Sequence, residues 1–325
     1  MEIGKVPNHI LKNYIFDNIK YKDEIKLYPS LGEDSAAVDI SGNIAVLTCD
    51  PVTASDNNSG YISVIIVCND LASSGAIPVG ILSTILLPPN SSENEFAKII
   101  ENIKVACDEL NITLLGGHSE VTHNVTKPII ISTGFGKTED KYLVSTKNAK
   151  VKDKIIITKS LAIEGTAIIA NDFEDRLKEF LPDKLISEAK NFIKNICVVK
   201  EGLIARKYAN SMHDITEGGL FGALYEVCKA SNVGAIIYER NIKLNKITQK
   251  ICEHFNINPY KLISSGSMLI TTNKAEELLN ELKQNNIDAF IIGEVIESNE
   301  IKFIRLDGSI EYINESPIDE IYKVK

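Results

Sequence analysis

Short β-type runs alternate with helical patterns along both halves of the chain, and this alternation restricts the fold more than any other feature of the sequence. The first half carries runs such as "NIAVLTCD" (43–50), and the second half restarts with "KIIITK" (154–159). A charged stretch, 138–153, separates the two. Such alternation predicts α/β and α+β layers and excludes a helical bundle or a β-sandwich. At about 150 residues per domain, the 325 residues predict two domains, 1–150 and 151–325.

One helix is clear in the pattern, and one stretch is ambiguous. Apolar residues recur at helical spacing from Phe96 to Leu110, and Ser92 with Glu95 forms a capping-box pattern before them. By contrast, "YISVIIVCNDLASSG" (61–75) is rich in β-branched residues, which favour a strand, yet it is long enough for four helical turns. Periodicity alone does not decide between the two. In the second half, helices are expected near 183–209, 217–230, 246–255 and 274–284, with a short β pair at the C-terminus.

Composition and charge exclude several classes of protein. The net charge is −9 and no run of Lys and Arg is longer than a pair, so neither nucleic acid nor an anionic membrane is an expected partner. The N-terminus lacks a signal-peptide core and no apolar run approaches membrane-spanning length, which predicts a cytoplasmic protein. Six scattered cysteines without a Cys-x-x-Cys pair predict reduced, mostly buried thiols.

Four carboxylates share one setting, at the end of an apolar or small-residue run. They are Asp34, Asp50, Asp70 and Asp214. An acid in this position is most often a turn or cap residue, but four of them spread over both halves can converge in a cleft between the domains. They would repel one another there unless metal ions neutralised them, and Mg²⁺ favours carboxylates that also face substrate phosphates. The sequence thus suggests a magnesium–phosphate site.

Several glycines lie where a strand or loop meets a polar group, and a residue without Cβ lets backbone amides approach a phosphate closely. They are Gly32, Gly116, Gly117, Gly218 and Gly219. The last two open an apolar helix, whose positive end could face an anion. Tight helix packing is an equal explanation for that pair.

Two other motifs were weighed. His118 and Glu120 follow the double glycine and would project in the same direction from an extended chain, as expected of metal or water ligands or acid–base groups. A polar loop with a hydrogen-bonded histidine is the alternative. "STGFGKT" (132–138) looks like a phosphate-binding P-loop, but Ile131 stands where that loop needs glycine, so a strand-end turn is expected.

Five motifs in order give the chain a family resemblance. "GEDSAAV", "TCDP", "CNDLASSGAIPVG", "LLGGHSEVT" and "HDITEGG" resemble the superfamily of aminoimidazole ribonucleotide (AIR) synthase (PurM), HypE, selenophosphate synthetase and thiamine-monophosphate kinase. The chain is most similar to the HypE-like, AIR synthase-related branch, with which it shares a "GKVP"-like start and "EGT" (164–166).

The resemblance implies a PurM-like two-domain fold. The N-terminal sheet would pair with that of a second subunit in a barrel-like homodimer, the C-terminal domain would hold a mixed sheet with helices, and 60–74 would be a helix. The resemblance also implies ATP with Mg²⁺ in the cleft. The metal and phosphate ligands would be Asp34, Asp50, Asp70 and Asp214, with Asn69 assisting. The shared chemistry is ATP-dependent activation or phosphorylation of an acceptor.

Diagnostic residues of the individual relatives are missing, so three functions stay open. HypE uses a C-terminal cysteine and selenophosphate synthetase an N-terminal one, whereas the last and first cysteines here are Cys252 and Cys49. "GGHS" replaces the "GGET" of AIR synthase and the "GGDT" of the kinase. The chain is therefore an ATP-dependent enzyme with an unidentified acceptor, a non-catalytic accessory protein with a hydrogenase-maturation partner, or a kinase of the thiamine-phosphate type. Acceptor specificity is expected in loops at 51–60 and 160–180.

Overall fold

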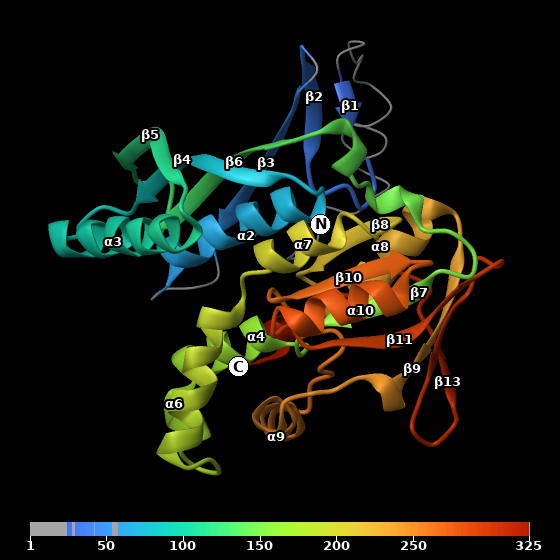
Figure 1. The fold of residues 1–325 in the computed structure, drawn as a ribbon. Helices are drawn as coiled ribbons and strands as arrows, with labels where there is room; N and C mark the ends of the chain where they lie inside the picture. Colours follow the sequence, from blue (N-terminus) through green and yellow to red (C-terminus); the bar gives the residue numbers. More distant parts are fainter. Residues whose placement is uncertain (1–24, 28–29, 42, 54–57, 325) are drawn as a thin grey trace.

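Two mixed β-sheets, one from each half of the chain, organise the computed structural model, which describes residues 25–27, 30–41, 43–53 and 58–324 (Figure 1). Sheet A has the strand order β1-β2-β3-β6-β4-β5, and only β4 and β5 pair in parallel. Its strands are β1 (Ile25–Leu27), β2 (Ala36–Ile40), β3 (Asn43–Val52), β4 (Ile77–Leu87), β5 (Thr113–Val121) and β6 (Ile129–Thr138). The "STGFGKT" motif is the end of β6, as expected of a segment that is not a P-loop.

Sheet B has the order β13-β12-β9-β11-β7-β10-β8, with β9 and β12 as its parallel pair. Its strands are β7 (Lys154–Thr158), β8 (Ser211–Ile215), β9 (Gly234–Tyr238), β10 (Ser267–Thr272), β11 (Ala289–Ile296), β12 (Ile301–Ile304) and β13 (Ile310–Tyr312). Two mixed sheets covered by helices confirm the α/β and α+β fold class, including the short C-terminal β pair.

Helices α2 (Ser59–Ser73) and α3 (Glu93–Leu110) cover one face of sheet A. The expected capping box opens α3: the Ser92 hydroxyl accepts from the Glu95 amide, and the Glu95 carboxylate accepts from the Ser92 amide. Helix α2 confirms the helix expected at 60–74. Thirteen of its fifteen residues are buried, because it lies between sheet A, α3 and α7 (Val199–Ala205). Burial on all sides removes the polar face that periodicity would detect.

Helix α8 (Gly219–Ser231) packs on one face of sheet B through Ile155 and Ile157, while α7 and α10 (Ala275–Gln284) share a core with Ile156 of the same strand. A third core joins α4 (Ile163–Asp172), α5 (Glu174–Leu177), α6 (Asp183–Asn191) and α9 (Lys246–Phe255). Strand alternation explains this arrangement, since successive residues of β7 point to opposite faces.

Two sequence expectations differ from the structure. The loop expected at 160–180 is largely helical, because apolar residues of α4 such as Ile169 and Ala170 complete the core with α6 and α9. The helix expected at 183–209 divides into α6, a 3₁₀ turn (Phe192–Asn195) and α7. It breaks where the amide of Val198 bonds to the side chain of Asn69 in place of a helical carbonyl, at 2.8 Å.

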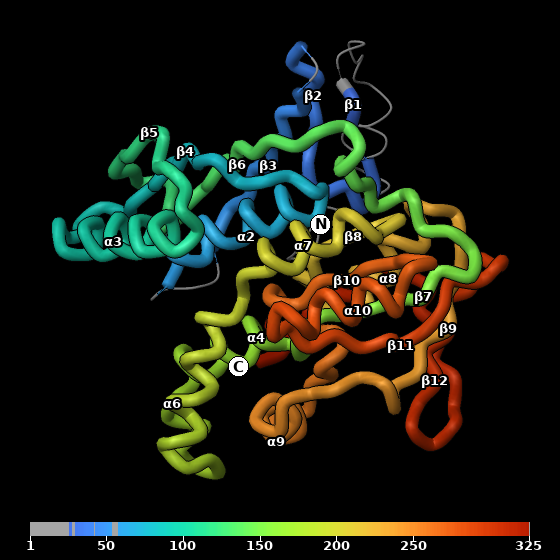
Figure 2. Tube along the Cα trace, viewed as in Figure 1, coloured from blue at the N-terminus to red at the C-terminus, as the bar shows by residue number. Residues whose placement is uncertain are grey.

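The charged segment between the sheets is packed against the structure. It is the green stretch between β6 and β7 in Figure 2, and it contains 3₁₀ turns at Asp140–Tyr142 and Thr146–Asn148. The Thr146 hydroxyl donates to the carbonyl of Met212 at 3.2 Å, and its carbonyl accepts from the Ser211 hydroxyl at 2.8 Å. Two further 3₁₀ turns, Glu239–Asn241 and Glu320–Lys323, complete the described elements.

In the described part of the chain, no helix covers the face of sheet A opposite α2 and α3. Leu82 on β4 and Leu115 on β5 are each about half exposed. The six described strands of sheet A do not close into a barrel by themselves, since β1 and β5 are its edges. None of the helices in the described part of the chain has both the length and the hydropathy that a bilayer-spanning helix needs.

Candidate active site

A cavity of about 520 Å³ lies between the two halves of the chain and is lined mainly by acidic and apolar side chains. The acids are Glu33, Asp34, Asp50, Asp70, Glu164, Asp214 and Glu217. Among the described residues that line the cavity there is no lysine, arginine or histidine. A space with seven carboxylates and no cationic side chain is a strong attractor for cations.

The structure brings the four sequence-predicted aspartates to this one cavity from four separate places. Asp34 precedes β2, Asp50 lies on β3, Asp70 on α2 and Asp214 on β8. Burial raises the pKa of Asp70 well above its usual range, and the charges of Asp50 and Asp214 raise it further. Burial, followed by the charge of Asp34, raises the pKa of Asp214 to about 8. The four carboxylates therefore repel one another in the absence of a cation.

One of these carboxylate oxygens lacks any hydrogen-bond partner in the described structure. It is Oδ2 of Asp214, which is fully buried. Asp70 is better satisfied, since its Oδ2 accepts from the Thr48 hydroxyl at 2.5 Å. Orphaned buried carboxylate oxygens are costly, and oxygen-only ligand sets are what Mg²⁺ prefers. The donor set thus fits a bound Mg²⁺, with Asp214 Oδ2 as a ligand that no protein group satisfies.

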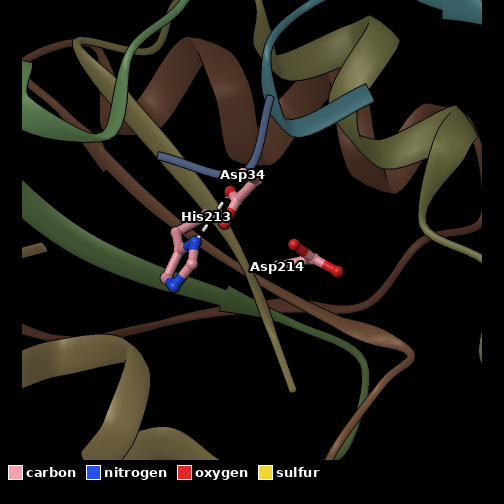
Figure 3. A group of neighbouring side chains, drawn as sticks. All are labelled: Asp34, His213 and Asp214. Carbon is pink, nitrogen blue, oxygen red and sulfur yellow. Dashed lines mark hydrogen bonds and ion pairs between the residues drawn. The ribbon is translucent and has the colours of Figure 1, made fainter. Parts of the chain in front are cut away.

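Asp34 is hydrogen-bonded to His213 of β8, as Figure 3 shows. The Nδ1 atom of His213 lies 2.7 Å from Asp34 Oδ2, and its Nε2 lies 2.7 Å from Glu226 Oε2 on α8. Burial lowers the pKa of His213, but the charges and hydrogen bonds of Asp34 and Glu226 outweigh this and raise it well above its usual range. The imidazolium therefore offsets part of the negative charge in the site. Asp34, His213 and Asp214 also lie close enough to hold a metal ion together.

Other walls of the cavity are apolar, and its C-terminal-half side carries further polar groups. Ile62, Ile66 and Ile168 are among the apolar lining residues. Glu164 of the "EGT" motif is buried beside Ser265, whose amide donates to it at 3.3 Å. The Tyr322 hydroxyl donates to Glu217 at 3.3 Å. A cavity with acids at one end and branched aliphatic walls can hold a molecule with a metal-bound anionic part and an uncharged part.

Asn69 and three of the predicted glycines have structural contacts of their own. The Asn69 carboxamide donates to the carbonyl of Ile196 at 2.9 Å and accepts from the Val198 amide, so it ties α2 to the second half of the chain. The Gly218 amide donates to Asp319 at 2.6 Å, so a carboxylate of the chain itself lies at the start of α8. A Cβ on Gly219 would lie 2.7 Å from the carbonyl of Leu262. Gly32, at φ +73°, packs closely on Glu226.

His118 and Glu120 lie on β5 together with Gly116 and Gly117, at the edge of sheet A and outside the cavity lining. As expected for alternate residues of an extended strand, their side chains approach each other, with 3.5 Å between His118 Nε2 and Glu120 Oε2. Both side chains are about half exposed or more. Within one chain, these four residues are not brought together with the aspartates.

Sequence reasoning did not single out Glu226, and it noted Glu33 and His213 only as the neighbours of Asp34 and Asp214. A signal for Glu226 was present: it is an acid inside the otherwise apolar stretch "GLFGALYEVC", and a buried glutamate nearly always has a partner. Burial raises the pKa of Glu33 to about 7, although the Ser145 hydroxyl donates to it. Its signal was weaker, because Asp34 beside it explained the acidity of the motif.

Comparison with known proteins gives relatives along most of the chain. A protein of Methanocaldococcus jannaschii named for hydrogenase expression and formation is 27% identical over 309 residues, which cover 89% of this chain and 88% of that protein. The selenide, water dikinase of Methanococcus maripaludis is 25% identical, covering 95% and 97%. The thiamine-monophosphate kinase of Pyrococcus horikoshii is 27% identical, covering 87% and 88%.

Solved structures share the fold. A chain of a HypE–HypF complex superposes with a TM-score of 0.76 at 22% identity, covering 94% of this chain and 99% of that one. AaThiL complexed with AMPPCP and TMP has a TM-score of 0.73 at 20% identity, covering 93% and 92%. HypE in complex with ATP has a TM-score of 0.70 at 18% identity, covering 98% of both chains.

Family models match both halves of the chain separately. Residues 32–138 match the N-terminal domain of AIR synthase related proteins, and residues 150–305 match the C-terminal domain. The first match contains Asp34, Asp50 and Asp70, and the second contains Asp214. With the sequence motifs, the two mixed sheets and these matches in agreement, the chain belongs to the AIR synthase-related family of the PurM superfamily and is HypE-like.

Proposed function

We propose that this protein binds ATP with Mg²⁺ in the cavity between its two halves and uses it to activate or phosphorylate an acceptor. The observation that carries the proposal is the convergence of Asp34, Asp50, Asp70 and Asp214 from four separate places in the chain, with one buried oxygen of Asp214 unsatisfied. Family membership supports it, since relatives include a kinase and a dikinase, and fold neighbours were solved with ATP or AMPPCP.

In such a site, different residues of the chain would bind the metal, orient its ligands and exclude water. The four aspartates would hold Mg²⁺, which neutralises phosphate charge during transfer. The Thr48 hydroxyl orients Asp70, and His213 orients Asp34. The aliphatic walls at Ile62 and Ile66 limit the water that reaches the transferring group.

Magnesium-dependent ATP turnover, measured with and without candidate acceptors, tests the proposal. Asp50→Asn and Asp70→Asn are expected to abolish it, since each removes a ligand charge. Asp175→Asn, at a fully exposed carboxylate on α5, serves as the matched control and should retain the wild-type rate. ATP binding that needs no divalent cation, or that survives both substitutions, would contradict the proposal.

A second copy of the chain is the occupant that we propose for the open face of sheet A. Leu82 and Leu115 expose apolar surface there. His118 and Glu120 lie on the same strand as Leu115, so an acid–base role for them requires the site of a neighbouring copy. Sedimentation velocity is expected to show a dimer. A monomer at tens of micromolar would argue against the dimer and against an acid–base role of His118 and Glu120.

A role in hydrogenase maturation is a second candidate function. It is supported by the name of the Methanocaldococcus relative and by the fold shared with HypE in its complex with HypF. In that case a HypF-like protein would bind this chain, with or without ATP turnover. Co-purification with a HypF-like protein tests it, and failure to bind would leave the small-molecule enzyme. A direct assay with thiamine monophosphate and ATP tests the kinase alternative suggested by the Pyrococcus relative.

A further inference from the structure

A buried chain of three side chains runs from α8 to the acidic end of the cavity. It begins at Glu226, which is 8% exposed, passes through His213, which is 3% exposed, and ends at Asp34. Both contacts measure 2.7 Å. The chain joins the two halves of the protein, because Asp34 precedes β2 while His213 and Glu226 belong to β8 and α8.

The hydrogen-bond chemistry fixes which groups can bind a cation. An ionised carboxylate has no proton to donate, so each ring nitrogen of His213 that faces one must be the donor. Both nitrogens are then used, and neither keeps a lone pair for a metal ion. Although His213 lies within metal-binding distance of Asp34 and Asp214, it is excluded as a ligand in this arrangement.

The same contacts restrict Asp34. Its Oδ2 accepts from His213 and lies 3.0 Å from the Ser73 hydroxyl, whose single proton is shared with the carbonyl of Asp70 at 2.8 Å. His213 and Ser73 thus restrict the orientation of the carboxylate, and Oδ1 is the oxygen that we expect to bind a cation. Restricting a ligand in this way is how groups behind a metal ligand raise metal affinity.

Glu226 is the origin of this arrangement. It lies in an apolar helix, where desolvation cancels most of the attraction within an ion pair, so an aliphatic residue would serve packing equally well. Its backbone also lies against the loop before Asp34, since a Cβ on Gly32 would lie 3.3 Å from the carbonyl oxygen of Glu226.

We propose that Glu226 is a positioning residue for the nucleotide-bound metal, acting through His213 to orient Asp34. The inference rests on the proposed Mg²⁺–ATP site. It predicts that the charge of Glu226, and not only its volume, sets metal affinity at a position that does not line the cavity.

Mn²⁺ binding to the full chain in the presence of AMPPCP, followed by electron paramagnetic resonance, provides the test. Glu226→Gln keeps the shape but removes the charge and should weaken Mn²⁺ binding about tenfold. Glu226→Asp, which keeps the charge at a shorter reach, should recover part of that loss. Glu201→Gln is the matched control, because Glu201 is equally buried and pairs with Lys159 at 2.9 Å away from the cavity lining. It should leave Mn²⁺ affinity unchanged.

The outcomes separate the two proposals. The proposed function itself fails if the wild-type protein does not bind Mn²⁺, or if Asp70→Asn binds Mn²⁺ as well as the wild type does. If wild-type protein binds and Glu226→Gln binds equally well, only the positioning role is overturned. A fall in melting temperature with unchanged Mn²⁺ affinity would also overturn it, because this is the result expected of a purely structural residue. If Glu226→Gln fails to fold, the single variants Ser73→Ala and Glu226→Asp take its place in the Mn²⁺ measurement. Wild-type Mn²⁺ affinity in both variants would then count against the inference.

Discussion

At the scale of single residues, the buried carboxylates of the candidate site destabilise the folded protein when no cation is bound. Asp70 is buried, and its pKa is raised by burial and by the charges of Asp50 and Asp214. Asp70→Asn should therefore stabilise the metal-free protein, because it removes a repelled charge while the amide oxygen still accepts from Thr48. A relief of about 1 kcal/mol corresponds to a rise of roughly 2 °C in melting temperature. The variant should also lose the rise in melting temperature that Mg²⁺ and ATP are expected to give the wild type.

Thermal melts with EDTA and with Mg²⁺ and ATP measure both effects. Asp175→Asn again provides the control, since it removes an exposed carboxylate and should leave both melting temperatures within about 1 °C. A lower melting temperature for Asp70→Asn in EDTA would mean that the carboxylate stabilises the fold, contrary to its role as a metal ligand.

The meeting of acids from both halves is the part of the candidate site for which the sequence carried a signal. Four aspartates at the ends of apolar runs were expected to meet between the halves, and they line one cavity. The partners behind them were not predicted, because contacts such as Asp34 with His213 join residues 179 positions apart and no spacing rule connects them. The roles of His118 and Glu120 stay predictions, since they lie on an edge strand outside the cavity.

At the scale of elements, α2 connects the two halves, and its setting explains why its pattern was ambiguous. It packs on sheet A on one side and on α7 on the other, where Gly202 of α7 approaches it. A helix covered on all sides carries β-branched and apolar residues throughout, which is also the composition of a buried strand. Only the family resemblance indicated a helix at 60–74, and α2 confirms it.

The contact between α2 and α7 leads to a prediction of its own. A Cβ on Gly202 would lie 2.5 Å from the carbonyl of Ala72, so Gly202→Ala must push the helices apart. Overpacking of this kind costs about 1–3 kcal/mol of unfolding free energy, which urea denaturation measures. Ser187→Ala, at an exposed position of α6, is the control and should change it by less than about 0.5 kcal/mol. Equal stability of the two variants would show that α2 and α7 are not held at this distance.

At the scale of the whole molecule, buried contacts across the halves make the cavity one unit. Asn69 bonds to the backbone at 196 and 198, Arg206 donates to the carbonyl of Gly75 at 2.9 Å, and His213 bonds to Asp34. Two domains and a cleft between them are predictions from chain length, the alternation of elements and the acids in both halves, and the cavity does lie between the halves. How the halves are joined does not follow, because it depends on side chains with no local pattern.

The buried carboxyl groups give the molecule an unusual dependence of stability on pH. Burial raises the pKa of Asp319 to about 6, although the amides of Gly218 and Ile321 donate to it. Burial likewise raises the pKa of Glu33 to about 7 and that of Asp214 to about 8. Between the unfolded values near 4 and these folded values, the native state holds more protons than the unfolded state. The free energy of unfolding must therefore fall as pH rises from about 4 to about 8.

Urea denaturation in EDTA at pH 5 and pH 8 measures this slope, and a flat or rising stability would contradict it. Asp319 alone contributes about 2 kcal/mol between pH 4 and pH 6, since the limiting slope is 1.36 kcal/mol per pH unit, so Asp319→Asn should flatten that part of the curve. Asp214 belongs to the proposed metal site, and a divalent cation binds only the ionised carboxylate. Mg²⁺ with ATP should then stabilise the protein more at pH 8 than at pH 5. Because Asp319 lies outside the cavity lining, Asp319→Asn should retain this gain while Asp70→Asn loses it.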